Sequence, residues 1–186
     1  KYSLQETKRG NVTQSLLTED ELVLTLVAHS VNSDINTPIA LPESEESWRK
    51  LCNLVGRHQL TSLVAGPLAD NGAPNMYTDS MISEGRRVCL RYYRLYWETR
   101  KICDLLEHAG MNSLVYKGCA VASYYPVPEL RKSGDIDIYV AEKDISCAKD
   151  VLTNAGYAFE PGQPGSHHFC FIAPHGFEIE LHRSLA

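Results

Sequence analysis

The chain has 186 residues, of which 44% are hydrophobic, and its formal net charge is −5 at pH 7. This length and apolar content allow one sizeable core, or a core with an added helical subdomain. The acidic balance argues against a general DNA binder, without excluding contact with an RNA end. The six cysteines form no Cys-x-x-Cys pair, which indicates reduced thiols, and no apolar run approaches about 20 residues. We therefore expect a cytoplasmic protein without a membrane span.

The first part of the chain predicts a series of helices. Thr18 and Glu21 have the spacing of a capping box before an apolar stretch, which indicates a helix start. A loop with two prolines and several acids follows over residues 31–47. A second helical pattern then begins near residue 46 and runs through Val55, and a third covers residues 60–68. After a break at 71–74, one long helix is expected over 78–108, with Gly110 as its left-handed cap.

The long helix carries basic residues along one side, namely Arg87, Arg91, Arg94 and Lys101. Aromatic residues are interleaved with them: Tyr92, Tyr93, Tyr96 and Trp97. One interpretation is a docking surface for a phosphate-rich acceptor, with the rings stacking on bases. The other is a solvated basic face with half of the aromatics in the core, and the negative net charge favours this second interpretation.

The rest of the chain alternates between strand and helix patterns. Strands are expected at 113–116, 135–140, 157–159, 169–172 and 177–182, and helices at 120–125 and 143–155. The prediction is an α+β fold, in which a helical N-terminal region (1–110) precedes a mixed β-sheet flanked by helices (111–186).

Asp135 and Asp137 lie two residues apart in one predicted strand, so their carboxylates point to the same face. Ile136 and Ile138 point to the other face, toward a core. Two neighbouring carboxylates repel one another unless a proton or a cation intervenes, and Mg²⁺ prefers oxygen ligands. The pair therefore indicates a metal site.

The segment Lys117-Gly118-Cys119 lies between a predicted strand and a predicted helix. Glycine at such a junction lets the backbone approach a ligand closely, and a helix N-terminus offers unpaired N–H groups to a phosphate. The junction is thus a candidate phosphate cradle.

Glu178, Glu180 and His182 share one face of the last predicted strand. If that strand neighbours the strand of Asp135 and Asp137, it adds a third carboxylate to the pair. His167 and His168 point to opposite faces of another strand, so at most one of them faces the site. No spacing typical of a zinc site recurs around these histidines, and zinc is therefore not expected.

Taken in order, these motifs resemble the nucleotidyltransferases of the DNA polymerase β superfamily. The closest resemblance is to poorly characterised bacterial members with an Arg…Asp-x-Asp…Glu-x-His pattern, and it covers roughly residues 114–182. It implies a nucleotidyltransferase-type sheet and a further C-terminal part, so that the chain is expected to be truncated at its C-terminus.

The resemblance also implies roles for individual residues. Asp135 and Asp137 would bind two Mg²⁺ ions, with Mn²⁺ as a substitute, and Glu180 would be the third carboxylate and an alternative general base. Gly118 matches the first position of the family's Gly-Gly or Gly-Ser pair. Cys119 departs from the second position, and its thiol is a poorer hydrogen-bond donor than a hydroxyl, although its backbone N–H remains.

Three further residues are candidates for contacts to phosphate. Lys117 and Arg131 could bind phosphate oxygens, or Lys117 could be solvated at a strand end while Arg131 braces the loop. Ser133 could contact phosphate, but a turn-capping role has more support.

The expected activity is transfer of a nucleoside monophosphate from a nucleoside triphosphate, such as ATP, to an acceptor hydroxyl, with release of pyrophosphate. The acceptor could be a protein, a small molecule or an RNA end. Two alternatives stay open: a metal-dependent glycosyltransferase that uses the Asp-x-Asp pair, and a nucleotide-binding module without turnover.

Overall fold

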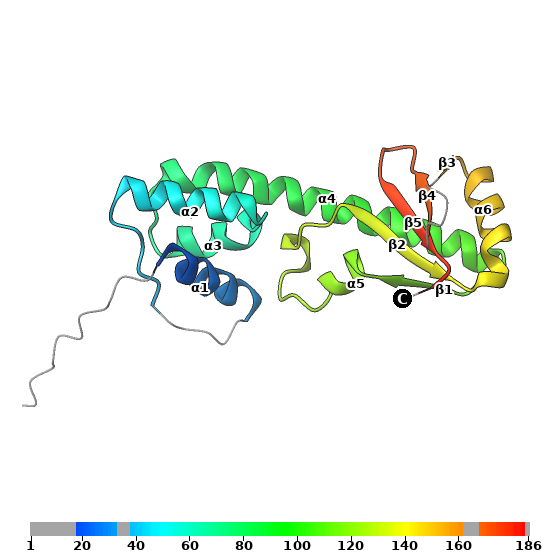
Figure 1. Ribbon diagram of the computed structural model, residues 1–186, viewed down its shortest axis with the longest axis horizontal. Coiled ribbons are helices and arrows are strands. Elements are labelled where there is room, and N and C mark those ends of the chain that lie inside the picture. Colours follow the sequence, from blue (N-terminus) through cyan, green and yellow to red (C-terminus); the bar gives the residue numbers. More distant parts are fainter. Residues whose placement is uncertain (1–17, 33–37, 162–167, 185–186) are drawn as a thin grey trace, which may run out of the picture.

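The computed structural model describes residues 18–32, 38–161 and 168–184. Part of the loop predicted at 31–47, and His167, lie outside these ranges. In Figure 1 the described helices α1 to α3 gather at one end of an elongated molecule and the β-sheet lies at the other.

The helical end contains α1 (Glu19–Val31), α2 (Glu45–Arg57) and α3 (Thr61–Asp70). The predicted capping box is confirmed, because the Thr18 side chain accepts from the backbone N–H of Glu21 and the Glu21 carboxylate accepts from that of Thr18. These helices and the start of the next bury one apolar cluster, which includes Leu22, Leu26, Trp48, Leu51, Val55, Val64, Leu68 and Met81.

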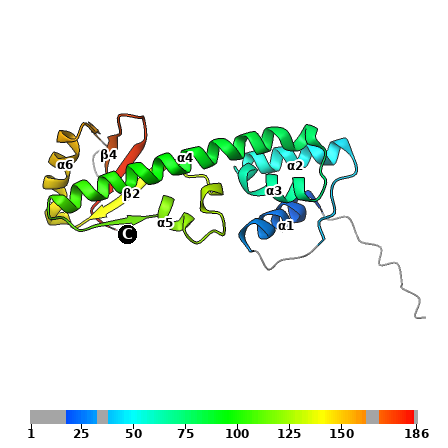
Figure 2. The ribbon, with the colours of Figure 1, turned by 180° about the vertical axis from the view of Figure 1, so that it is seen from behind.

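Helix α4 (Asn75–His108) runs from the helical end to the sheet in both views (Figures 1 and 2). It begins after Pro74 and stops before Gly110, whose φ of 78° is the left-handed cap conformation predicted from the sequence. Its early residue Met81 belongs to the helical core, whereas Leu95 belongs to the core beneath the sheet. Because α4 contributes to both cores, a division into two domains near residue 110 stays a prediction.

In the described part of the chain, the sheet has five strands in the order β1-β2-β5-β4-β3. These are β1 (Ser113–Tyr116), β2 (Asp135–Val140), β3 (Ala158–Glu160), β4 (His168–Ile172) and β5 (Glu178–His182). Strands β2 and β5 pair in parallel, while the other neighbouring pairs are antiparallel. The mixed sheet and the helices before it confirm the predicted α+β fold.

One face of the sheet is packed and the other is polar. Side chains of the packed face form a core with α4 and with α6 (Ile145–Asn154), which follows a 3-10 turn at Glu142–Asp144. This core includes Leu95, Ile102, Leu106, Ile136, Ile138, Leu152, Phe171, Ile179 and Leu181. Strand alternation therefore sends Asp135, Asp137 and Glu180 to the opposite face.

The helix predicted at 120–125 is wrong at both ends. Helix α5 covers Gly118–Ala122, and a 3-10 turn at Pro128–Leu130 follows later. Pro126 gives a physical reason for the early end, because a residue before proline, here Tyr125, is disfavoured in helical conformation. Within the described ranges, no helix has both the length and the apolar character needed to cross a membrane.

Truncating Leu95 tests whether the sheet depends on α4. Leu95 is 0% exposed, whereas Leu90 on the same helix is 60% exposed. We expect Leu95→Ala to lower the free energy of unfolding by about 2–5 kcal/mol in chemical denaturation, because it leaves a cavity in the core. Leu90→Ala is the matched control and should cost less than about 0.5 kcal/mol. Equal losses in the two variants would contradict this packing.

Candidate functional site

Three carboxylates meet on the polar face of the sheet. In the parallel pairing of β2 with β5, Asp137 lies opposite Glu180 and Asp135 lies opposite Glu178. One ligand oxygen from each of Asp135, Asp137 and Glu180 lies within 4.8 Å of the others. The pairing of β2 with β5 confirms the prediction that the strand of Glu180 neighbours the strand of Asp135 and Asp137. Glu178 is exposed and lies outside this group, so the contacts favour Glu180 as the third carboxylate.

Asp137 is the most deeply buried member of this carboxylate cluster, with 1% of its surface exposed. Its Oδ1 accepts a hydrogen bond from Lys117 Nζ at 2.9 Å and lies 3.2 Å from His182 Nε2. Its Oδ2 is buried and has no hydrogen-bond partner among the described residues. An unsatisfied buried acceptor costs about 1–3 kcal/mol, which a cation bound at this oxygen would offset. The carboxylate cluster therefore fits a hard divalent cation such as Mg²⁺.

Lys117 directly follows Tyr116, the last residue of β1, which lies opposite Asp137 in the pairing of β1 with β2. The side chain of Lys117 therefore lies beside Asp137. The Lys117 backbone has a φ of 55°, and the next residue, Gly118, has a φ of 28°. This positive φ is the reason that glycine is favoured at the start of α5, since a Cβ at Gly118 would be in ordinary contact, 3.4 Å from the carbonyl oxygen of Asp135. The hydrogen bond to Asp137 raises the pKa of Lys117 and keeps its ammonium charged.

The loop before β2 is braced by two arginines. Arg131 Nη1 donates to Ser133 Oγ at 2.6 Å and to the carbonyl oxygen of Gly118 at 3.2 Å. Arg91 Nε donates to the carbonyl oxygen of Ser133 at 3.0 Å, and its Nη2 donates to that of Gly134 at 2.6 Å. These contacts are structural, and phosphate binding by Arg131 or Ser133 stays a prediction.

The side chain of Cys119 packs against the core of the sheet. Burial raises the pKa of its thiol. Any contact of Cys119 with a phosphate would therefore come from its backbone N–H, as the poor donor character of a thiol already suggested.

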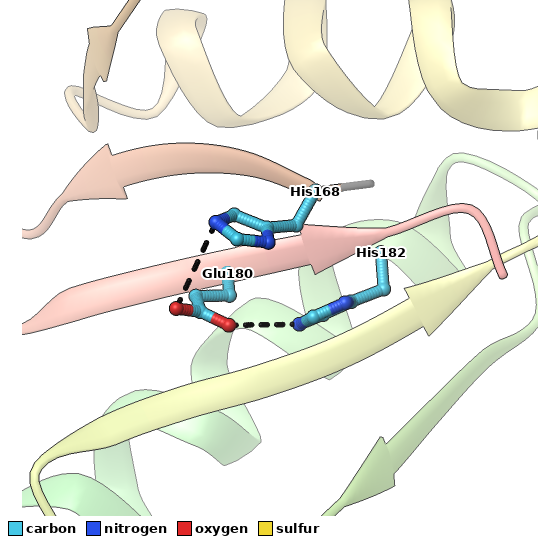
Figure 3. Close-up of side chains that lie close together, drawn as sticks. All are labelled: His168, Glu180 and His182. Atoms are coloured by element: carbon cyan, nitrogen blue, oxygen red, sulfur yellow. Dashed lines mark hydrogen bonds and ion pairs between the residues drawn. The ribbon is translucent and has the colours of Figure 1, made fainter. Parts of the chain in front are cut away.

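Two histidines flank Glu180 on the polar face (Figure 3). His182 Nε2 lies 3.1 Å from Glu180 Oε2, and His168 Nε2 lies 3.8 Å from Glu180 Oε1. The rings of Tyr116 and His182 pack edge to face, and their centroids are 5.0 Å apart. The alternation of side chains along a strand could have predicted that His168 lies on this face. Its proximity to Glu180 could not be predicted, because it depends on the pairing of β4 with β5.

The basic residues of α4 are exposed, but Arg87 and Arg91 already have partners, and their role as a docking surface stays a prediction. Arg91 is engaged with the loop before β2, and Arg87 Nη2 lies 2.7 Å from Glu84 Oε2. The expectation that half of the aromatics enter the core is wrong. Tyr93, Tyr96 and Trp97 are 46%, 41% and 70% exposed, and Tyr92 is only partly buried.

A protein-family model matches this chain. Its description is "uncharacterised nucleotidyltransferase", and the match covers residues 44–186, which include the carboxylate cluster and Lys117. Neither the curated proteins nor the solved structures contain a match to the chain.

Replacing Lys117 tests the electrostatics of the carboxylate cluster. Its ammonium neutralises part of the Asp137 charge and competes electrostatically with a divalent cation bound at Oδ2, so we expect Lys117→Met to bind Mn²⁺ about fivefold to tenfold more tightly without nucleotide. The affinity can be measured by electron paramagnetic resonance of free Mn²⁺. Lys132→Met removes an equal charge from an exposed residue in the loop before β2 and should change the affinity less than twofold. Weaker binding by the Lys117 variant would contradict the competition.

Proposed function

The chain belongs to this family of nucleotidyltransferases, and we propose that it transfers a nucleoside monophosphate from a nucleoside triphosphate to an acceptor hydroxyl, releasing pyrophosphate. The proposal adds a dependence on Mg²⁺, which Mn²⁺ could replace, and assigns the reaction to the polar face of the sheet. The observation that carries it is the carboxylate cluster of Asp135, Asp137 and Glu180, whose oxygens lie within 4.8 Å of one another.

The residue types suit this chemistry. Nucleotidyl transfer requires mainly the positioning of phosphates and the neutralisation of their charge. In the proposal, Asp135, Asp137 and Glu180 hold the divalent cations, which supply Lewis-acid stabilisation of the phosphate oxygens when bound. The unpartnered Oδ2 of Asp137 offers an oxygen that costs no existing hydrogen bond.

Phosphate binding is assigned to the segment that approaches β2 from β1. The side chain of Lys117 is 56% exposed while its ammonium contacts Asp137, so it can turn from the carboxylate to a bound triphosphate. Gly118 and Cys119 offer backbone N–H groups at the start of α5. Arg131 and Ser133 lie next to this segment, since Arg131 bonds to the Gly118 carbonyl.

Glu180 has two possible duties in this mechanism. It can bind a cation with the two aspartates, or it can accept the proton of the acceptor hydroxyl as a general base. Both duties require its carboxylate beside Asp137, which the register of β2 and β5 provides.

The first test is calorimetric titration of the four nucleoside triphosphates with and without Mg²⁺. We expect Mg²⁺-dependent binding of at least one of them to fall at least tenfold in the Asp135→Asn, Asp137→Asn double variant, because the cation loses two of its anionic ligands. Thermal unfolding followed by circular dichroism would establish that the variant is folded.

Glu178→Gln is the matched control for this experiment. It removes a negative charge opposite Asp135 in the register, but from an exposed residue outside the carboxylate cluster. Its binding should remain within twofold of that of the unaltered chain. Mg²⁺-dependent binding retained by the folded double variant would refute the proposed metal site, and binding of a nucleotide sugar in preference to all four triphosphates would favour the glycosyltransferase interpretation.

A further inference from the structure

The second group of potential metal ligands on the polar face consists of His168, Glu180 and His182. One ligand atom from each lies within 4.8 Å of the others. Figure 3 shows the two imidazoles on either side of the Glu180 carboxylate, each with a nitrogen directed at a different oxygen. The ring centroids of the two histidines are 5.2 Å apart. Two nitrogens and a carboxylate oxygen thus lie close enough together to bind one ion after small side-chain rotations.

The sheet itself holds these three side chains in place. His168 lies directly opposite His182 in the antiparallel pairing of β4 with β5, and Glu180 is on the same face as His182. The His182 side chain is only 9% exposed, and Tyr116 packs against its ring. Ligands carried by paired strands are positioned before any metal binds, which lowers the cost of assembling a site.

The donor atoms distinguish this group from the carboxylate cluster. Imidazole nitrogens suit borderline divalent metals such as Zn²⁺, whereas Mg²⁺ prefers oxygen ligands alone. Two histidines and one carboxylate also leave a coordination position for water or a ligand oxygen, as in open zinc sites. We propose that His168, Glu180 and His182 form a second metal site, selective for a Zn²⁺-type divalent cation.

Glu180 belongs to both sites, and His182 Nε2 also lies 3.2 Å from Asp137 Oδ1, so the inference rests on the proposed function through these two links. Its Oε2 is the oxygen near His182, while Oε1 is the one near His168. The two histidines have no assigned role in nucleotide binding, so either site can be absent while the other is present.

The proposal departs from the expectation that zinc is not bound, which rested on spacing along the chain. Zinc ligands on one helix or in one loop show a short recurrent spacing. Here the ligands come from two strands, and only the pairing of β4 with β5 brings them together.

Cobalt titration tests the site, because Co²⁺ reports its ligands through its visible absorption and substitutes for Zn²⁺. With the chain freed of metal, we expect a nitrogen and oxygen ligand spectrum that stoichiometric Zn²⁺ abolishes but excess Mg²⁺ does not. His168→Ala should weaken Co²⁺ binding at least about 100-fold, since it removes a direct ligand. The side chain of His168 is 32% exposed, so this variant should fold.

His175→Ala is the matched control, because His175 is an exposed histidine in the turn between β4 and β5. It should leave Co²⁺ affinity within twofold. Equal Co²⁺ affinity in the His168 and His175 variants would overturn the site and leave the histidines as hydrogen-bond partners of Glu180. A sulfur-to-cobalt charge-transfer band would overturn it as well, by showing ligation through a thiol such as Cys170.

Asp135→Asn separates this inference from the proposed function. We expect it to retain the Co²⁺ spectrum while losing Mg²⁺-dependent triphosphate binding, and His168→Ala to show the reverse. A chain that binds Co²⁺ at the histidines but no triphosphate would refute the proposed function and leave the second site standing.

Discussion

The candidate site depends on the parallel pairing of β2 with β5 in a register that sets Asp137 opposite Glu180. Alternation along each strand then puts the carboxylates on one face and Ile136, Ile138, Ile179 and Leu181 on the other. A shift of one residue would move the carboxylates into the apolar core, where unpaired charge is strongly disfavoured. Burial of the isoleucines and the leucine therefore fixes the register, and with it the geometry of the carboxylate cluster.

The polar face concentrates negative charge that the protein must balance by itself when no metal is bound. Lys117 provides one positive charge 2.9 Å from Asp137, and His182 provides a polar contact to both Asp137 and Glu180. The ammonium is on a long, half-exposed side chain, which makes it a replaceable partner. A buried anion with a removable counterion is the arrangement expected where another cation must bind.

Much of the fold could be predicted because its signals are local. The capping box at Thr18, the cap at Gly110 and the alternation through Asp135 and Asp137 each depend on a few neighbouring residues. The features that the sequence could not provide depend on contacts between distant segments. The engagement of Arg91 with the loop before β2 and the approach of His168 to Glu180 are of this kind.

The exposed aromatics of α4 show how pattern alone misleads. In a helix that lies on a core along its whole length, interleaved tyrosines and tryptophan would be expected to divide between core and solvent. Between residues 92 and 97, α4 instead buries Leu95 in the core of the sheet. Tyr93, Tyr96 and Trp97 remain exposed to solvent. Because α4 spans two cores, its middle turns need fewer buried side chains than its length suggests. The apolar content of a segment therefore indicates burial only when the number of neighbouring elements is known.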